Sequence, residues 1–151
     1  MNATRRTVLI AGALSAITAL SFSSAVFAAS DLVEVQSLNA ANKPITVAVP
    51  KNPQRIAVAD FSVLDTLDHW GLGERIVALP QTTALPYLPQ YFKKSKKVTN
   101  LGTLKEIDLE GLMAAEPDVI FISGRLAKKY DELSKIAPVV FMTADHEKGT
   151  F

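Results

Sequence analysis

The sequence contains no cysteine among its 151 residues. Disulfide bonds and a cysteine nucleophile are therefore excluded, and the folded chain must rely on a hydrophobic core. Several motifs of large enzyme classes are absent as well. There is no Gly-x-Ser-x-Gly elbow, no Walker-type phosphate loop and no Gly-x-Gly-x-x-Gly fingerprint. We therefore predict no catalytic residue and a protein that is not an enzyme.

An excess of charge of either sign is also absent. Sixteen Lys and Arg residues stand against fifteen Asp and Glu residues. Residues 1–28 hold two of the basic residues and none of the acidic ones, so the remainder has fourteen against fifteen, a net charge near −1. Binding of nucleic acid or of an anionic membrane through bulk charge is disfavoured by this balance. We expect no nucleic-acid partner.

Acidic residues and a histidine lie close together at Asp60, Asp65, Asp68 and His69. They raise the alternative of an exported, metal-dependent α/β hydrolase. Their spacing does not match HExxH or a similar ligand pattern, and a solvated helix face explains them better. We predict no metal site here, and the hydrolase remains the alternative from another functional class.

The first 28 residues have the pattern of a secretory signal peptide. Arg5 and Arg6 precede an apolar run over residues 8–22, and small residues follow up to Ala28. The run is short of the roughly 20 residues that span a bilayer. We expect export and cleavage near Ala28, with the general secretory and the twin-arginine routes both open. No lipid-attachment cysteine follows, so we expect a soluble exported protein.

The remainder alternates between strand and helix patterns. Continuous apolar runs of β-forming residues are typical of strands that are covered on both faces. This rhythm predicts an α/β fold with an open, mainly parallel sheet and helices on both faces, preceded by a small N-terminal β-hairpin. The expected hairpin strands are 32–35 and 45–49, and the expected sheet strands are 55–59, 76–79, 119–122 and 139–142.

Apolar residues at helical spacing define the expected helices. Ser62 is the expected N-cap of the first helix, which Gly71 and Gly73 end, and Asp108 is the expected N-cap of the second, which Pro117 ends. The expected buried faces are Val63, Leu64, Leu67 and Trp70, then Leu109, Leu112 and Met113, then Tyr130, Leu133 and Ile136.

Arg125 is the first functional candidate because it follows the strand over residues 119–122. Ligands of open α/β sheets bind at the carboxyl ends of the strands. Arginine offers a planar fork of donors to anionic oxygens, and Lys128 would share its helix face. A surface salt bridge of Arg125 is the alternative. Tyr87, in a loop after an earlier strand, and Thr103, in the loop before Asp108, are further candidate ligand-binding residues.

Five segments in register carry a resemblance to a known family. They are residues 53–60 (PQRIAVAD), 64–73 (LDTLDHWGLG), 100–110 (NLGTLKEIDLE), 116–125 (EPDVIFISGR) and 129–138 (KYDELSKIAP). Together they resemble the N-terminal lobe of the periplasmic binding proteins that feed iron-siderophore and cobalamin ABC importers. The likeness is greatest to the ferric catecholate (enterobactin-type) binders, and it runs from about Val33 to Asp145.

The resemblance implies a monomeric, periplasmic binding component whose ligand is a ferric siderophore of the catecholate type. Haem, cobalamin and ferric citrate are alternatives on the same scaffold. It further implies that Arg125 and Lys128 contact the anionic siderophore, and that Glu110 docks to an ABC permease in the inner membrane. Alternatively, Glu110 is only an acidic residue favoured in the first turn of a helix. No cofactor is expected, because iron would arrive with the ligand.

The family pattern also sets expected boundaries. Residues 29–145 are expected to form the N-terminal lobe, and residues 146–151 to begin the segment between the lobes. A family member would continue into a second lobe, so we expect either a fragment of a longer product or a truncated copy.

Overall fold

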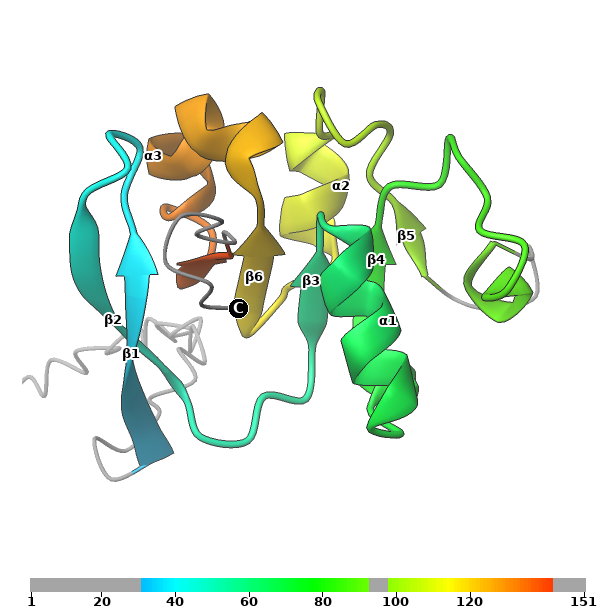
Figure 1. Cartoon of the computed structure of the whole chain (residues 1–151), viewed down its shortest axis with the longest axis horizontal. Coiled ribbons are helices and arrows are strands. Elements are labelled where there is room, and N and C mark those ends of the chain that lie inside the picture. Colours follow the sequence, from blue (N-terminus) through cyan, green and yellow to red (C-terminus); the bar gives the residue numbers. More distant parts are fainter. Residues whose placement is uncertain (1–30, 93–97, 143–151) are drawn as a thin grey trace, which may run out of the picture.

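The computed structural model describes residues 31–92 and 98–142. The expected signal peptide and the expected interlobe segment lie outside these residues. Within the described residues, seven strands form two sheets (Figure 1). Strands β1 (Leu32–Leu38) and β2 (Pro44–Pro50) pair in an antiparallel hairpin. The strands of the main sheet are β3 (Ile56–Val58), β4 (Ile76–Leu79), β5 (Thr99–Asn100), β6 (Val119–Ile122) and β7 (Val139–Phe141). Their order in the sheet is β5-β4-β3-β6-β7, and all of the pairs are parallel. The predicted fold class is therefore confirmed.

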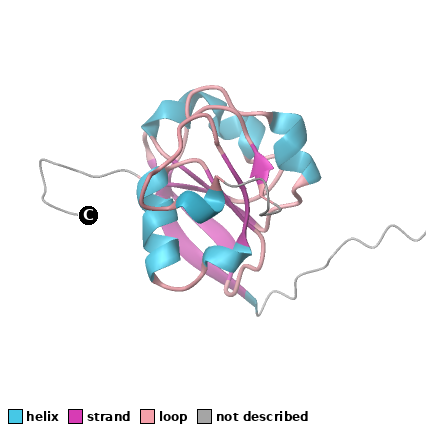
Figure 2. Cartoon of the chain, turned by 90° about the vertical axis from the view of Figure 1, so that its right-hand side faces the viewer, coloured by secondary structure: helices cyan, strands magenta, loops and turns pink. Residues whose placement is uncertain are grey.

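Helices cover both faces of the main sheet (Figure 2). One face carries α1 (Phe61–His69) and the short 3₁₀ helix η3 (Pro89–Tyr91). The other carries α2 (Leu109–Ala114), the 3₁₀ helix η4 (Gly124–Lys129) and α3 (Tyr130–Leu133). A further 3₁₀ turn, η2 (Gly73–Arg75), leads directly into β4. No helix within 31–92 and 98–142 has the length and apolar character needed to cross a membrane.

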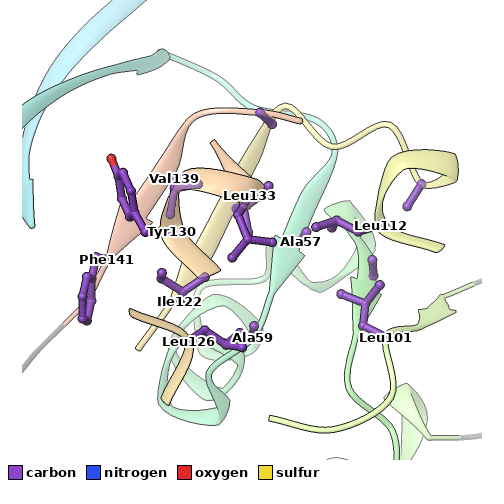
Figure 3. Close-up of a cluster of buried hydrophobic side chains, with 14 residues drawn as sticks. Ala57, Ala59, Leu101, Leu112, Ile122, Leu126, Tyr130, Leu133, Val139 and Phe141 are labelled. Atoms are coloured by element: carbon purple, nitrogen blue, oxygen red, sulfur yellow. The ribbon is translucent and has the colours of Figure 1, made fainter. Parts of the chain in front are cut away.

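The core is divided by the sheet into two clusters, because successive strand residues point to opposite faces. Figure 3 shows the cluster on the α2 and α3 side, where Leu112 and Leu133 point toward Ala57. This α2/α3 core consists of Ala57, Ala59, Ala78, Leu101, Leu112, Ala115, Ile120, Ile122, Leu126, Tyr130, Leu133, Ala137, Val139 and Phe141. The α1 core consists of Val49, Ile56, Val58, Val63, Leu64, Leu67, Ile76, Leu79, Leu88, Tyr91, Val119 and Val140.

The hairpin packs along the β7 edge of the main sheet. The Ser37 hydroxyl of β1 is buried and accepts a hydrogen bond from the Phe141 backbone N–H at 2.9 Å. Val35 and Val47 pack on the α1 core, while Leu38 and Ile45 pack on the α2/α3 core. The hairpin thus contacts both cores, and β1 supplies a hydrogen-bond acceptor to a backbone N–H group of β7.

Three details of the expected helices were wrong. Asp60, rather than Ser62, is the N-cap of α1, because its carboxylate accepts the backbone N–H groups of Ser62 and Val63. Trp70 is 67% exposed, since α1 ends at His69 and Trp70 is already the C-cap. Met113 is 55% exposed, because the buried side of α2 runs from Leu112 to Ala115. The predicted cap Asp108 is confirmed by its hydrogen bond from Gly111 N–H at 3.0 Å.

Candidate functional site

The strand order reverses between β3 and β6. From β3 the chain proceeds to β4 and β5 on one side, and then crosses to β6 and β7 on the other. In open α/β sheets, the crevice beyond the carboxyl ends at such a switch point is where ligands bind. Asp60 and Phe61 follow β3 there, and Ser123 to Arg125 follow β6. The connections that leave the strands lie along the upper edge in Figure 1.

An open pocket of about 370 Å³ lies at this edge. Four connections line it, those after β3, β4, β5 and β6. Its lining residues are Phe61, Thr82, Thr83, Thr103, Leu104, Lys105 and Arg125. The structure therefore brings two predicted ligand-binding residues together, Arg125 and Thr103. The other two, Tyr87 and Lys128, do not line it, although both follow the same sheet edge.

Arg125 presents its cation to this pocket. It is exposed in the first turn of η4, whose N-cap is Ser123. Within residues 31–92 and 98–142, Arg125 forms no hydrogen bond and no ion pair, and the one described ion pair joins Lys129 and Glu132. The salt-bridge alternative therefore finds no support in the described part of the chain. Lys128 lies three residues on in a 3₁₀ helix, where side chains at i and i+3 eclipse.

The Asn100 side chain joins the loops after β4 and β5. Its amide oxygen accepts hydrogen bonds from the backbone N–H of Gln81 at 3.1 Å and of Gly102 at 2.9 Å. Gly102 has a φ of +80°, which favours glycine, and an added Cβ would lie 3.1 Å from the Glu106 carbonyl oxygen. The Thr82 hydroxyl donates to the Gly102 carbonyl at 3.1 Å. The two walls of the pocket are thereby held together.

Thr103 organises the loop that carries two other pocket residues. Its hydroxyl oxygen accepts the backbone N–H groups of Lys105 at 3.1 Å and Glu106 at 2.8 Å. The same hydroxyl donates to the Glu106 carbonyl at 3.3 Å. These hydrogen bonds form an ST-turn, in which the threonine side chain bonds to nearby backbone, and the turn holds Leu104 and Lys105 at the pocket. Lys105 is exposed and, like Arg125, has no hydrogen bond from its side chain within the described residues.

Asp60 is a buried carboxylate beside the pocket. It is 8% exposed and accepts the Ser62 hydroxyl and the Ser62 N–H, the latter at 2.9 Å. Burial, the largest single influence, raises the pKa of Asp60. The hydroxyls of Ser62 and Ser123 and the N–H groups of Val63 and Ser62 more than offset it and hold the pKa below its usual 3.8. The Ser123 contact is the looser one, because its buried hydroxyl meets no acceptor with full hydrogen-bond geometry in the described residues.

This depressed pKa predicts an acid-sensitive contribution to stability. The Asp60 contribution is fully present above pH 3.8 and is lost as the pH falls through the lower pKa of the folded state. Asp60→Asn keeps a capping side chain but removes the charge. We expect it to lower the free energy of unfolding at pH 7 and to differ less from the parent at pH 3. Urea unfolding at both pH values measures this difference.

Asp65→Asn is the matched control for that measurement, because Asp65 lies exposed on the same helix. We expect it to change the free energy of unfolding by less than about 0.5 kcal/mol at either pH. An Asp60→Asn deficit of equal size at pH 7 and pH 3 would contradict the assigned role of the Asp60 charge.

The four residues that raised the alternative of a metal site do not converge on one point. Asp60 caps α1, and Asp68 accepts the Tyr91 hydroxyl at 2.5 Å and the Gln90 side chain at 3.1 Å. Asp65 and His69 are exposed. Among residues 31–92 and 98–142, no group of three or more His, Cys, Asp or Glu side chains is arranged to hold a metal ion.

Glu110 lies apart from the pocket. It is exposed in the first turn of α2, whose N-cap is Asp108. An acidic side chain at this position suits the positive end of the backbone dipoles and remains free to meet another molecule.

Sequence reasoning missed Phe61 and Lys105 as pocket residues. Phe61 was not among the residues expected on the buried face of the first helix, although it lies three residues after the end of β3. Lys105 was missed because β5 has only two residues and gave no strand pattern, so its carboxyl end could not be placed. A search of the first positions after the expected strand over residues 55–59 would have found Phe61, whereas no expected strand ends shortly before Lys105.

Comparison with known proteins relates this chain to periplasmic binding proteins. The model of a family described as periplasmic binding protein matches residues 56–150. The petrobactin-binding protein YclQ of Bacillus subtilis is 41% identical over 100 residues, which cover 66% of this chain and 31% of YclQ. The Fe(3+) dicitrate-binding periplasmic protein FecB of Escherichia coli is 32% identical over 103 residues, covering 68% of this chain and 34% of FecB.

Solved structures agree with the sequence matches. The crystal structure of YclQ superposes with a TM-score of 0.68 and 35% identity, covering 78% of this chain and 40% of that structure. The periplasmic catecholate-siderophore binding protein VctP of Vibrio cholerae gives a TM-score of 0.63 and 31% identity, covering 77% and 39%. The chain spans about a third of the length of the curated relatives it matches.

Proposed function

The chain belongs to the periplasmic binding protein family, and from this membership we propose that it is the substrate-binding component of an ABC importer for ferric siderophores. The ligand in this proposal is of the catecholate type. The protein acts by binding and is not an enzyme. Iron enters the site as part of the ligand, so the protein needs no cofactor of its own.

One observation carries the proposal. Arg125 lines a pocket at the switch point of the sheet and has no partner in residues 31–92 and 98–142. An unpaired guanidinium in such a place suits an anionic ligand, because its donors form charge-assisted hydrogen bonds to anionic oxygens. A ferric catecholate carries negative charge on its oxygens and matches this requirement.

The proposal also assigns parts to the three other predicted ligand-binding residues and to Lys105, which was not predicted from the sequence. Thr103 shapes the loop at the pocket through its backbone hydrogen bonds. Lys105 adds a second cation to the pocket lining. Lys128 shares the face of Arg125 in η4, and Tyr87 is 63% exposed in the loop after β4. In the proposal, Lys128 and Tyr87 contact parts of a large ligand that extend beyond the pocket.

Ferric citrate is the second candidate ligand. The observation that favours it is the 32% identity with FecB, which is named for Fe(3+) dicitrate. YclQ and VctP, named for petrobactin and a catecholate siderophore, favour the first candidate. Both ligands are anionic iron chelates, so Arg125 serves either of them.

The proposal places the protein outside the inner membrane. Residues 1–28 would direct export, residues 29–145 would form the N-terminal lobe, and Glu110 would dock to the permease. Uptake of ⁵⁵Fe delivered as a ferric catecholate tests this function in iron-starved host cells. Deletion of the gene should lower that uptake, and the gene supplied in trans should restore it. Unaltered uptake after deletion, in a strain without a second binding protein for the same importer, would contradict the proposal.

Charge reversal at Glu110 is expected to separate binding from transport. Glu110 is exposed and outside the pocket, so Glu110→Lys should leave the affinity for the ferric siderophore within about twofold of the parent. Uptake should fall about tenfold or more, because the reversed charge repels a basic docking surface. Uptake by the complemented deletion strain and binding by the purified protein are the two measurements.

Glu106→Lys is the control for this variant, because Glu106 is also exposed and acidic but lies in the loop before α2. We expect it to leave uptake near the parent level. Equal loss of uptake in both variants would contradict a specific docking role for Glu110.

A further inference from the structure

We propose that Phe61 is the residue that selects aromatic iron chelates over aliphatic ones. This inference rests on the proposed function and deepens it, because it assigns the choice between the two candidate ligands to one side chain.

Phe61 lies at the centre of the switch point. It is the first residue of α1, directly after the capping residue Asp60 and three residues after the end of β3. It lines the pocket together with Arg125, which follows β6, the strand that pairs with β3. Phe61 is half-buried, so part of the ring remains available at the pocket.

The ring of Phe61 is supported from the protein side by Phe92. The two ring centroids are 6.2 Å apart, and the ring planes make an angle of 77°. This edge-to-face arrangement is favourable between aromatic rings. Phe61 and Phe92 also pack on the α1 core. A supported ring loses little freedom when a ligand ring packs on it, which favours binding.

The other pocket residues offer mostly apolar surface and positive charge. The hydroxyls of Thr82 and Thr103 are already bonded to loop backbone, which leaves their methyl groups for a ligand. Leu104 adds further apolar surface. Thr83 alone among the three threonines has a hydroxyl without a hydrogen bond in the described residues.

A pocket of this composition fits an aromatic anion better than an aliphatic polycarboxylate. A catecholate has a flat ring that can pack against Phe61 and oxygens that Arg125 and Lys105 can bind. Citrate has no ring to pack against Phe61, so in this pocket its carboxylates rely on the charges of Arg125 and Lys105 alone. Phe61 therefore contributes to catecholate binding and contributes nothing specific to citrate binding.

Two ligands and three variants test this assignment. The ligands are a ⁵⁵Fe-labelled ferric tris-catecholate and ⁵⁵Fe-labelled ferric dicitrate, measured by equilibrium dialysis with the purified protein. Phe61→Leu keeps an apolar side chain without a ring, and we expect it to lower catecholate affinity by about two- to tenfold. It should leave dicitrate affinity unchanged. Phe61→Tyr keeps the ring and should bind the catecholate within about twofold of the parent.

Phe92→Leu supplies the third variant and an independent test if Phe61→Leu fails to fold. It leaves the Phe61 ring in place without its edge-to-face partner, so it should lower catecholate affinity less than Phe61→Leu and leave dicitrate affinity unchanged. An equal fall for both ligands, or no fall for the catecholate, would overturn the role of Phe61. If the parent protein binds neither the ferric catecholate nor ferric dicitrate, that result would instead overturn the proposed function.

Discussion

Arg125→Ala is expected to lower the affinity for a ferric catecholate by about ten- to a hundredfold. A hydrogen bond to a charged group contributes about 1.5–3 kcal/mol, and each 1.4 kcal/mol corresponds to a factor of ten. Arg125 makes no internal hydrogen bond in the described residues, so its removal leaves no protein group unsatisfied. The loss should therefore appear in ligand binding and not in the free energy of unfolding. Equilibrium dialysis and urea unfolding of the same variant measure the two quantities.

Two further variants sharpen this test. Arg125→Lys keeps the charge but loses the planar fork, and we expect an affinity between those of the parent and of Arg125→Ala. Lys135→Ala removes an exposed cation near the end of α3, away from the pocket lining, and should leave the affinity unchanged within about twofold. Equal losses for Arg125→Ala and Lys135→Ala would show that net charge, and not the pocket arginine, governs binding.

Leu112→Ala is expected to lower the free energy of unfolding by about 2–5 kcal/mol. Leu112 is fully buried in the α2/α3 core and is the buried residue of the six-residue helix α2 (Figure 3). Its truncation leaves a cavity over β3 that the short helix cannot fill without losing its cap at Asp108. Urea unfolding monitored by circular dichroism measures the change.

Met113→Ala is the matched control because it lies on the same helix and is 55% exposed. We expect a change within about 0.5 kcal/mol. Similar losses for Leu112→Ala and Met113→Ala would contradict the orientation of α2 and restore Met113 to the core.

The sheet could be predicted from sequence because its strands are short apolar runs of β-forming residues. Residues 119–122 and 76–79 are buried or half-buried on both faces, so these runs show no alternation of apolar and polar residues. The two-residue strand β5 could not be predicted, since its pairing with β4 depends on tertiary position and not on local pattern. The predicted N-cap of α1 was wrong because two residues that can cap a helix lie close together in the sequence. Asp60 and Ser62 can both cap, and only the extended backbone at Asp60 decides between them.

Part of the candidate site was predictable for a physical reason. Arg125 follows a strand that is recognisable from sequence, and the carboxyl edge of a parallel sheet is a general binding edge. Phe61 and Lys105 required the fold, because each meets Arg125 only when β3 and β5 are placed beside their partners. The Ser123 hydroxyl and the Asp60 carboxylate likewise come together only through the pairing of β3 with β6.

Binding of a ferric catecholate to the purified protein tests the central claim most directly. Equilibrium dialysis with a ⁵⁵Fe-labelled ferric catecholate should show saturable binding of one chelate per chain. The affinity should fall as salt is raised, because exposed cations in the pocket are screened. Absence of saturable binding by ferric catecholates and by ferric dicitrate alike would contradict the assignment of this pocket to iron-chelate recognition.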